Sequence, residues 1–133
     1  MILVDSSVWI DYFLGNETPQ VEILDRSLGV REVGLGDLVL TEVLQGFRSD
    51  KDYRIARSLM DALTVVDMLG KELAIKSAEN FRALRKMGIT IRKTADVIIA
   101  TYCIEHDVAL LFSDKDFKPF VQHLQLIEVG CNK

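Results

Sequence analysis

The sequence predicts an α/β protein in which helices cover both faces of a parallel sheet. Short, wholly apolar segments such as Ile2–Val4 and Ala109–Phe112 alternate with longer segments of helical periodicity. Continuous apolar runs of this kind are typical of parallel strands buried on both faces. A carboxylate, Asp5 or Asp114, closes each of these two runs. Ligands of such sheets bind beyond the carboxyl ends of the strands, so the two acids should face each other there if their strands are neighbours.

Glycines and a proline delimit the first elements. The strand Ile2–Val4 leads into a helix over residues 7–14, which Gly15 ends because glycine readily adopts the left-handed conformation after a helix. Pro19 is expected to begin the second helix, since its fixed backbone angle suits the first helical position. Gly29 follows the end of that helix.

The middle of the chain predicts two strands separated by two helices. Glu32–Leu35 is expected to form a weak second strand, and Asp37 to be the N-cap of a helix that ends at Gln45. Residues 50–63 have apolar side chains at helical spacing. These are Ala56, Leu59, Met60 and Leu63. Thr64–Asp67 is expected to be the third strand.

The second half contains the longest helix and the most apolar one. The segment 71–87 has an apolar stripe that we expect to face the core, made of Ala74, Ala78, Phe81 and Leu84. The segment 94–106 is apolar nearly all round, so it should be buried between layers. Ala109–Phe112 is the expected fourth strand, a short helix begins at Asp116, and Leu126–Val129 is the expected last strand.

Length and charge limit the function classes. The 133 residues suit one domain, spanning 1–133, with 49% apolar and 27% charged residues. A net charge of −4 argues at first against a nucleic-acid partner. Without four candidate site acids, however, 16 acidic residues remain against 16 Lys and Arg. A bound divalent cation would invert the sign at that site, so the composition allows a phosphate-bearing substrate.

The remaining composition indicates a cytoplasmic protein. Cys103 lies in an apolar helical segment and is expected to be a buried thiol, and neither it nor Cys131 belongs to a C-x-x-C pattern. The N-terminus enters a strand without a basic leader, which predicts no signal peptide. No apolar run approaches the ~20 residues that cross a bilayer. We therefore expect no contact with a membrane.

Four carboxylates, Asp5, Glu42, Asp96 and Asp114, carry the chemical hypothesis. Most have a structural alternative: Asp5 as an N-cap, Asp96 as an anion favoured in the first turn of a helix, and the nearby Asp116 as a cap. Glu42 is the hardest to explain structurally, because it interrupts an otherwise apolar helix and an unpaired charge there is costly.

Gathered at one site, these acids would suit a divalent metal. Hard cations relieve the repulsion between clustered carboxylates, and ligation by oxygen alone suits Mg²⁺ or Mn²⁺. The matching chemistry is in-line hydrolysis of a phosphodiester by a metal-activated water, which needs no catalytic histidine. His106 and His123 are accordingly expected to be surface residues.

Four segments then resemble, in order, the motifs of PIN-domain ribonucleases, in particular the VapC toxins of bacterial toxin–antitoxin pairs. They are Val4–Phe13 (VDSSVWIDYF), Thr41–Gly46 (TEVLQG), Ala95–Ala100 (ADVIIA) and Ser113–Phe117 (SDKDF). The likeness covers essentially the whole chain. One departure is Phe112, where many relatives have Thr or another polar residue.

This resemblance implies a three-layer α/β/α PIN-like fold, with a central parallel sheet of about five strands and the first strand in the middle. It also implies metal-dependent endonuclease activity on RNA, inhibition by a cognate antitoxin, and a homodimer or a toxin–antitoxin hetero-oligomer. Asp5, Glu42, Asp96 and Asp114 match the catalytic acidic quartet of the family, and Asp116 matches an acid often found beside it. The expected metal ligands are Asp5, Asp96, Asp114 and Asp116.

Arg92 and Lys93 are the basic residues best placed to contact RNA. They lie just before the helix that carries Asp96, where phosphate contact and simple solvent exposure are equally open. Two other basic groups lie on helices whose opposite faces carry apolar stripes, which favours solvated surfaces. Their members are Arg48, Lys51, Arg54 and Arg57 in one group, and Arg82, Arg85 and Lys86 in the other.

Three alternatives remain. A receiver or haloacid-dehalogenase-type phosphatase also gathers acids at strand ends, but Ser6 and Ser7 stand after Asp5 where those folds need further acids. A metal-free PIN-like scaffold that binds RNA or protein is disfavoured by the complete quartet. A processing nuclease that is not a toxin would have the same motifs and stays open.

Overall fold

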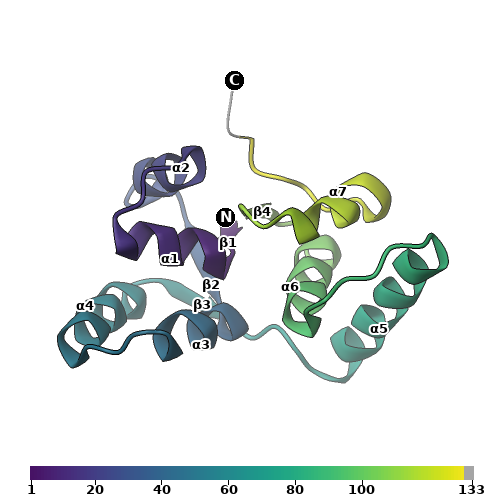
Figure 1. Ribbon diagram of the computed structural model, residues 1–133, viewed down its shortest axis with the longest axis horizontal. Helices are drawn as coiled ribbons and strands as arrows, with labels where there is room; N and C mark the ends of the chain where they lie inside the picture. The colour runs from purple at the N-terminus through teal and green to yellow at the C-terminus, as the bar shows by residue number, and fades with distance from the viewer. Residues whose placement is uncertain (131–133) are drawn as a thin grey trace.

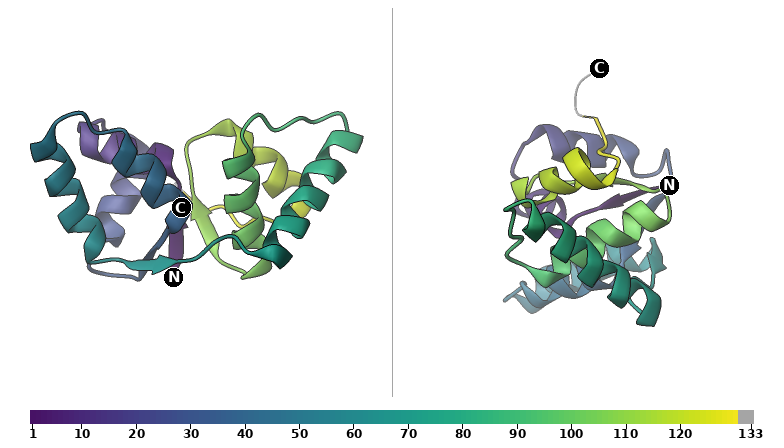
Figure 2. Two further views of the ribbon diagram at one scale, coloured as in Figure 1. Left: turned by 90° about the horizontal axis from the view of Figure 1, so that it is seen from below. Right: turned by 90° about the vertical axis from the view of Figure 1, so that its right-hand side faces the viewer.

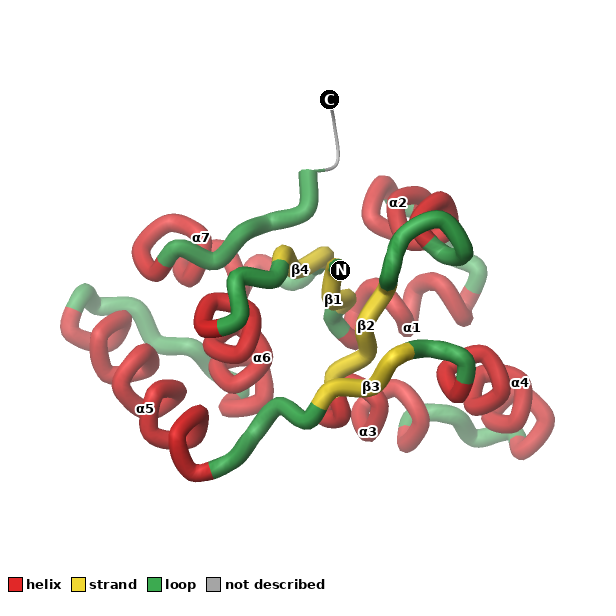
Figure 3. The backbone as a smooth tube through the Cα atoms, turned by 180° about the vertical axis from the view of Figure 1, so that it is seen from behind, coloured by secondary structure: helices red, strands yellow, loops and turns green. Residues whose placement is uncertain are grey.

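The sheet of the computed structural model, which describes residues 1–130, has four parallel strands in the order β3-β2-β1-β4 (Figures 1 and 3). The strands are β1 (Ile2–Val4), β2 (Val33–Gly36), β3 (Thr64–Val66) and β4 (Ala109–Leu111). In register, Ile2 of β1 pairs with Val33 on one side and Ala109 on the other. The first strand therefore lies inside the sheet, as the resemblance implied, and β4 is its neighbour, which meets the condition for Asp5 and Asp114 to face each other.

The predicted fifth strand, Leu126–Val129, is wrong. Only an isolated parallel bridge between Leu110 and Glu128 forms there. Its hydrogen bonds run from Leu110 N–H to the Ile127 carbonyl (2.9 Å) and from Val129 N–H to the Leu110 carbonyl (3.0 Å). The segment meets β4 at one residue only and leaves Ile127 half exposed, so no ladder develops.

Helices cover both faces of the sheet, which confirms the three-layer α/β/α architecture. They are α1 (Ser6–Leu14), α2 (Pro19–Ser27), α3 (Asp37–Gln45), α4 (Asp50–Asp61), α5 (Lys71–Lys86), α6 (Thr94–Glu105), the 3₁₀ turn η1 (Lys115–Phe117) and α7 (Lys118–Leu124). Helices α1–α4 lie on one side of the sheet and α5–α7 on the other (Figure 2). Within residues 1–130, no helix is both long enough and apolar enough to cross a membrane.

The core is centred on β1 and α6. Every residue of β1 is buried, and α6 buries most of its length, including Val97, Ile99 and Cys103. This confirms that α6 lies between layers and that Cys103 is a buried thiol. Burial raises the pKa of this thiol to about 12, so the thiol stays protonated and unreactive.

Close packing explains the glycines of β2. A Cβ atom on Gly34 would lie 2.6 Å from Met1 Sδ and 2.8 Å from Leu3 Cδ2, and one on Gly36 would collide with Met68. These glycines therefore let neighbouring side chains lie against the strand.

The predicted N-cap of α3 needs correction. The N-cap of α3 is Gly36, and Asp37 lies in the first turn. One oxygen of Asp37, Oδ1, accepts hydrogen bonds from the backbone N–H of Leu38 (2.8 Å) and of Met68 (3.1 Å). Asp37 thus ties the start of α3 to the segment after β3 rather than only capping its own helix.

The buried face of α5 differs in part from the predicted apolar stripe. Phe81 and Leu84 pack in the core as predicted, but Ala74 and Ala78 are exposed and Ser77 is buried. Helix α5 also meets α6 through a polar contact, in which Asn80 Nδ2 donates a 3.0 Å hydrogen bond to Thr101 Oγ1. Apolar periodicity alone does not reveal such a contact.

Candidate metal centre

Two adjacent strands bring Asp5 and Asp114 to one edge of the sheet. Val4 of β1 pairs with Leu111 of β4, and the Asp5 N–H extends this pairing with a 2.9 Å bond to the Leu111 carbonyl. Asp5 is then the N-cap of α1, and Asp114 is the N-cap of η1. The structure thus places both acids at the carboxyl ends of neighbouring parallel strands.

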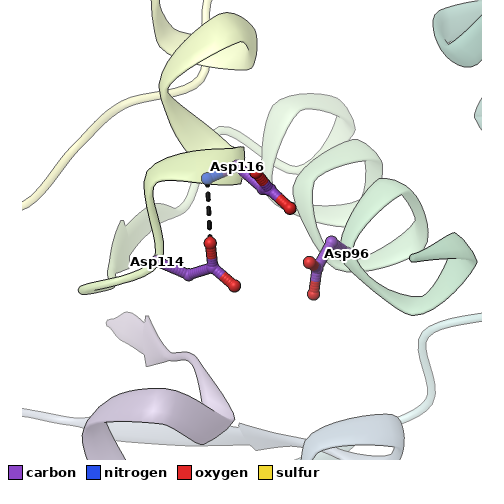
Figure 4. Close-up of side chains that lie close together, drawn as sticks. All are labelled: Asp96, Asp114 and Asp116. Atoms are coloured by element: carbon purple, nitrogen blue, oxygen red, sulfur yellow. Dashed lines mark hydrogen bonds between the residues drawn. The ribbon is translucent and has the colours of Figure 1, made fainter. Parts of the chain in front are cut away.

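Asp96 joins Asp114 and Asp116 in a compact triad. Each of the three offers a carboxylate oxygen, and these oxygens all lie within 4.8 Å of one another (Figure 4). The Asp116 N–H donates a 2.9 Å hydrogen bond to Asp114 Oδ1, which orients the Asp114 carboxylate. Three convergent oxygens of this type fit a hard divalent cation.

The electrostatics of Asp96 connect the triad to the other two acids. Asp96 is 3% exposed, and its Oδ2 has no hydrogen-bond partner among residues 1–130. Burial raises the pKa of Asp96 to about 7; the charges of Asp5, Asp114 and Glu42 add to the rise, and that of Lys93 opposes it. The predicted quartet therefore shares one electrostatic environment around Asp96.

Asp5 is both a helix cap and a potential ligand. Its Oδ2 accepts hydrogen bonds from the Ser7 N–H (3.2 Å) and the Ser7 hydroxyl (2.7 Å), while its buried Oδ1 has no partner in the described part of the chain. Burial raises the pKa of Asp5, the bonds from Ser7 lower it, and the charge of Asp114 adds a smaller rise. The capping alternative thus accounts for one oxygen and leaves the other unexplained.

Glu42 approaches the same region from α3. Its Oε1 is buried and has no hydrogen-bond partner within the residues that the structure describes, although Glu42 as a whole is only half-buried. Both Glu42 and Asp5 lie outside the compact triad. Their roles in ligation or catalysis accordingly stay predictions.

Arg92 and Lys93 lie beside the acids. Arg92 contacts Asp116 Oδ2 through Nη2 (3.3 Å) and Nε (3.4 Å), and Lys93 Nζ lies 3.9 Å from Asp114 Oδ2. The sequence placed both residues near the site but gave no sign of these ion pairs, because their partners belong to a distant segment of the chain.

The model of the PIN domain family matches residues 2–120 of this sequence. The chain belongs to the PIN-domain family. Among named relatives it is similar to Ribonuclease VapC11 of Mycobacterium tuberculosis and to VapC ribonuclease Mb1587 of Mycobacterium bovis. Each is 26% identical over 119 residues, covering 88% of this chain and 89% of the relative.

Solved structures confirm the PIN-like fold. VapBC2 from Rickettsia felis, bound to a DNA fragment from its promoter, contains a chain that aligns with a TM-score of 0.77 at 16% identity, over 97% of this chain and 98% of that chain. FitAcB from Neisseria gonorrhoeae aligns with a TM-score of 0.74 at 16% identity, over 98% of both chains.

The histidines are surface residues, as predicted, and the aromatic residues of α1 pack together. His106 and His123 are exposed. Trp9 is fully buried, stacks on Phe13 with ring centroids 5.9 Å apart, and meets Tyr12 edge-on. This tryptophan belongs to the core of the PIN domain and is not a platform for a nucleobase.

Ser7 is the site residue that the sequence reasoning missed. Its two hydrogen bonds hold the Asp5 carboxylate in place, so it acts on the site by positioning Asp5. The signal was present in the Asp5–Ser6–Ser7 sequence, because an Asp before a helix commonly accepts a bond from the N–H two residues later.

Proposed function

We propose that this PIN domain, spanning residues 1–133, is an endoribonuclease that hydrolyses RNA phosphodiester bonds with Mg²⁺ or Mn²⁺. The observation that carries the proposal is the convergence of Asp96, Asp114 and Asp116, with Asp5 electrostatically coupled to Asp96 at the same sheet edge. Ligation by oxygen atoms alone suits Mg²⁺ or Mn²⁺, and hydrolysis by a metal-activated water needs no catalytic histidine.

Each acid has a proposed task. Asp96, Asp114, Asp116 and the free Oδ1 of Asp5 would hold the metal, which when bound lowers the pKa of a water and neutralises charge on the phosphate. The unpaired Oε1 of Glu42 would orient the attacking water and accept its proton. Arg92 and Lys93 at the rim would hold the RNA backbone.

The names of the relatives and neighbours support a toxin role. The relatives are called VapC ribonucleases, and the titles of several neighbours describe VapBC or toxin–antitoxin complexes. We infer that this chain is the toxin of a type II pair, inhibited in the cytoplasm by a cognate antitoxin, within a homodimer or a toxin–antitoxin hetero-oligomer. A processing nuclease is the second candidate, and a small neighbouring reading frame for a DNA-binding antitoxin would decide between them.

Removal of metal should abolish RNA cleavage by the purified protein. Because the site has oxygen ligands only, incubation with Mn²⁺ should cleave a mixed RNA substrate, and EDTA in excess over Mn²⁺ should stop the reaction. Adding back Mg²⁺ or Mn²⁺ should restore it. Cleavage that continues unchanged in EDTA would contradict the metal-dependent mechanism, and binding without cleavage would favour the scaffold alternative.

Replacing Arg92 and Lys93 with Ala should weaken RNA binding and flatten its salt dependence. Each lost phosphate contact should reduce the slope of log K against log salt concentration by about 0.7 for single-stranded RNA. The measurement is fluorescence anisotropy of a labelled RNA at several salt concentrations, with Arg57→Ala on the distant α4 as the control. A slope equal to that of the unmodified protein would show that Arg92 and Lys93 are solvated surface residues that do not contact RNA phosphates.

A further inference from the structure

The basic pair Arg92–Lys93 and the acidic pair Asp114–Asp116 neutralise each other across the rim of the site. Arg92 binds Asp116 Oδ2 through two nitrogens, and Lys93 Nζ approaches Asp114 Oδ2. The Lys93 charge also lowers the pKa of Asp96. The two basic side chains are thus counter-ions of the same triad that fits a divalent cation.

The carboxylates that these side chains contact belong to the triad that fits a metal. On Asp114, Oδ1 already accepts the backbone hydrogen bond from Asp116, which leaves Oδ2 as the freer ligand atom. That Oδ2 is the atom that faces Lys93. On Asp116, Oδ2 accepts both Arg92 contacts. A cation at the triad therefore competes with Lys93 for the Asp114 carboxylate and with Arg92 for the charge of the Asp116 carboxylate.

The ion pairs are weak enough to exchange. The side chains of Arg92 and Lys93 are 78% and 58% exposed, whereas those of Asp116 and Asp114 are 24% and 23% exposed. Ion pairs with such exposed partners contribute little to stability, because water screens the charges and holding two long side chains in place costs entropy. A divalent ion, which carries twice the charge, should displace them while leaving both basic side chains at the rim.

We propose that Arg92 and Lys93 exchange partners: they neutralise Asp116 and Asp114 until a divalent cation takes those oxygens, and they then bind the RNA phosphates beside the metal. This inference rests on the proposed function, and it adds a coupling between the two ligands. Metal binding releases the side chains that hold RNA, so by linkage RNA should also strengthen metal binding. Before metal binds, Arg92 and Lys93 would neutralise the charges of Asp116 and Asp114. After metal binds, the released positive charges of Arg92 and Lys93 would be available to RNA.

The test compares the Mn²⁺ affinity of three proteins by titration calorimetry without RNA. The double variant Arg92→Met and Lys93→Met removes both counter-ions but keeps the aliphatic stems. The control Lys115→Met removes one positive charge from η1, between Asp114 and Asp116, and Lys115 has no ion pair within residues 1–130. The double variant should bind Mn²⁺ about fivefold more tightly, because two weak pairs no longer have to be broken. The control should change the affinity by less than about twofold.

A second measurement distinguishes exchange from a general change of charge. At saturating Mn²⁺, the double variant should have a raised KM for RNA. It should thus bind RNA more weakly although it binds Mn²⁺ more tightly. Unchanged or weaker Mn²⁺ binding by the double variant, or equal tightening by Lys115→Met, would overturn the exchange while leaving the nuclease proposal intact. Tight Mn²⁺ binding without RNA cleavage by the unmodified protein would instead overturn the proposed function, and absence of Mn²⁺ binding would overturn both.

Discussion

Replacing Asp96 with Asn should abolish RNA cleavage and stabilise the metal-free fold. Asp96 is buried beside other carboxylates, and its pKa of about 7 reflects the cost of keeping that charge. Asn has nearly the same shape without the charge, so the free energy of unfolding in EDTA should rise by roughly 1–3 kcal/mol near pH 8. Cleavage should fall by more than roughly 100-fold, because even groups that only orient metal ligands cost 10–100-fold.

Initial rates at saturating Mn²⁺ measure the loss of RNA cleavage, and urea denaturation in EDTA measures the gain in the free energy of unfolding. Asp5→Asn should show the same pair of changes, since Asp5 is equally buried and contributes to the pKa shift of Asp96. Asp25→Asn, an exposed carboxylate on α2, is the charge-matched control and should change neither quantity. An Asp96→Asn protein that cleaves RNA at the unmodified rate would show that Asp96 is not a ligand.

Stabilisation by Mn²⁺ should depend strongly on pH. A carboxyl whose pKa is higher in the folded state binds its proton more tightly there, so the contribution of Asp96 to metal-free stability is greatest below about pH 4. It should decrease as the pH rises towards about 7, the pKa of Asp96, and level off above it. Metal needs the deprotonated carboxylate and competes with that proton. Mn²⁺ should therefore stabilise the protein more at pH 8 than at pH 5.5.

The melting temperature measures this difference. With Mn²⁺ at about 100 times its Kd, binding contributes about 2.7 kcal/mol, which raises the Tm of a domain of this size by roughly 8–12 °C at pH 8. At pH 5.5 the rise should be less than about half of that. In the Asp96→Asn variant, the melting temperature without metal should depend less on pH, and Mn²⁺ should raise the melting temperature by less. Equal Tm shifts at pH 5.5 and pH 8 would contradict the role assigned to Asp96.

The framework of the site could be predicted because it follows from strand ends and helix starts. Asp5 and Asp114 close apolar runs, and parallel strands align their carboxyl ends, so local sequence and one rule of topology bring these acids together. Asp96 in the first turn of α6 follows from the start of that helix. The adjacency of β1 and β4 was a condition of the argument, and the structure meets it.

The features that could not be predicted depend on contacts between distant segments. The hydrogen bond between α5 and α6 joins Asn80 and Thr101 on different helices, and apolar periodicity wrongly assigned Ala74 and Ala78 to the buried face of α5. The segment Leu126–Val129 has the pattern of a strand, but it meets β4 at a single bridge. The pairing of Arg92 with Asp116 likewise requires the folded chain.

A crystal structure of the protein with Mn²⁺ tests the central claim most directly, through the anomalous scattering of the ion. We expect an anomalous peak at the triad, roughly 2.0–2.2 Å from oxygens of Asp96 and Asp114, with Asp5 or Asp116 completing the ligands directly or through water. Arg92 and Lys93 should then be turned away from Asp116 and Asp114. A crystal at saturating Mn²⁺ with no peak at these carboxylates, or with its peak elsewhere, would contradict the claim that they form the metal centre of a nuclease.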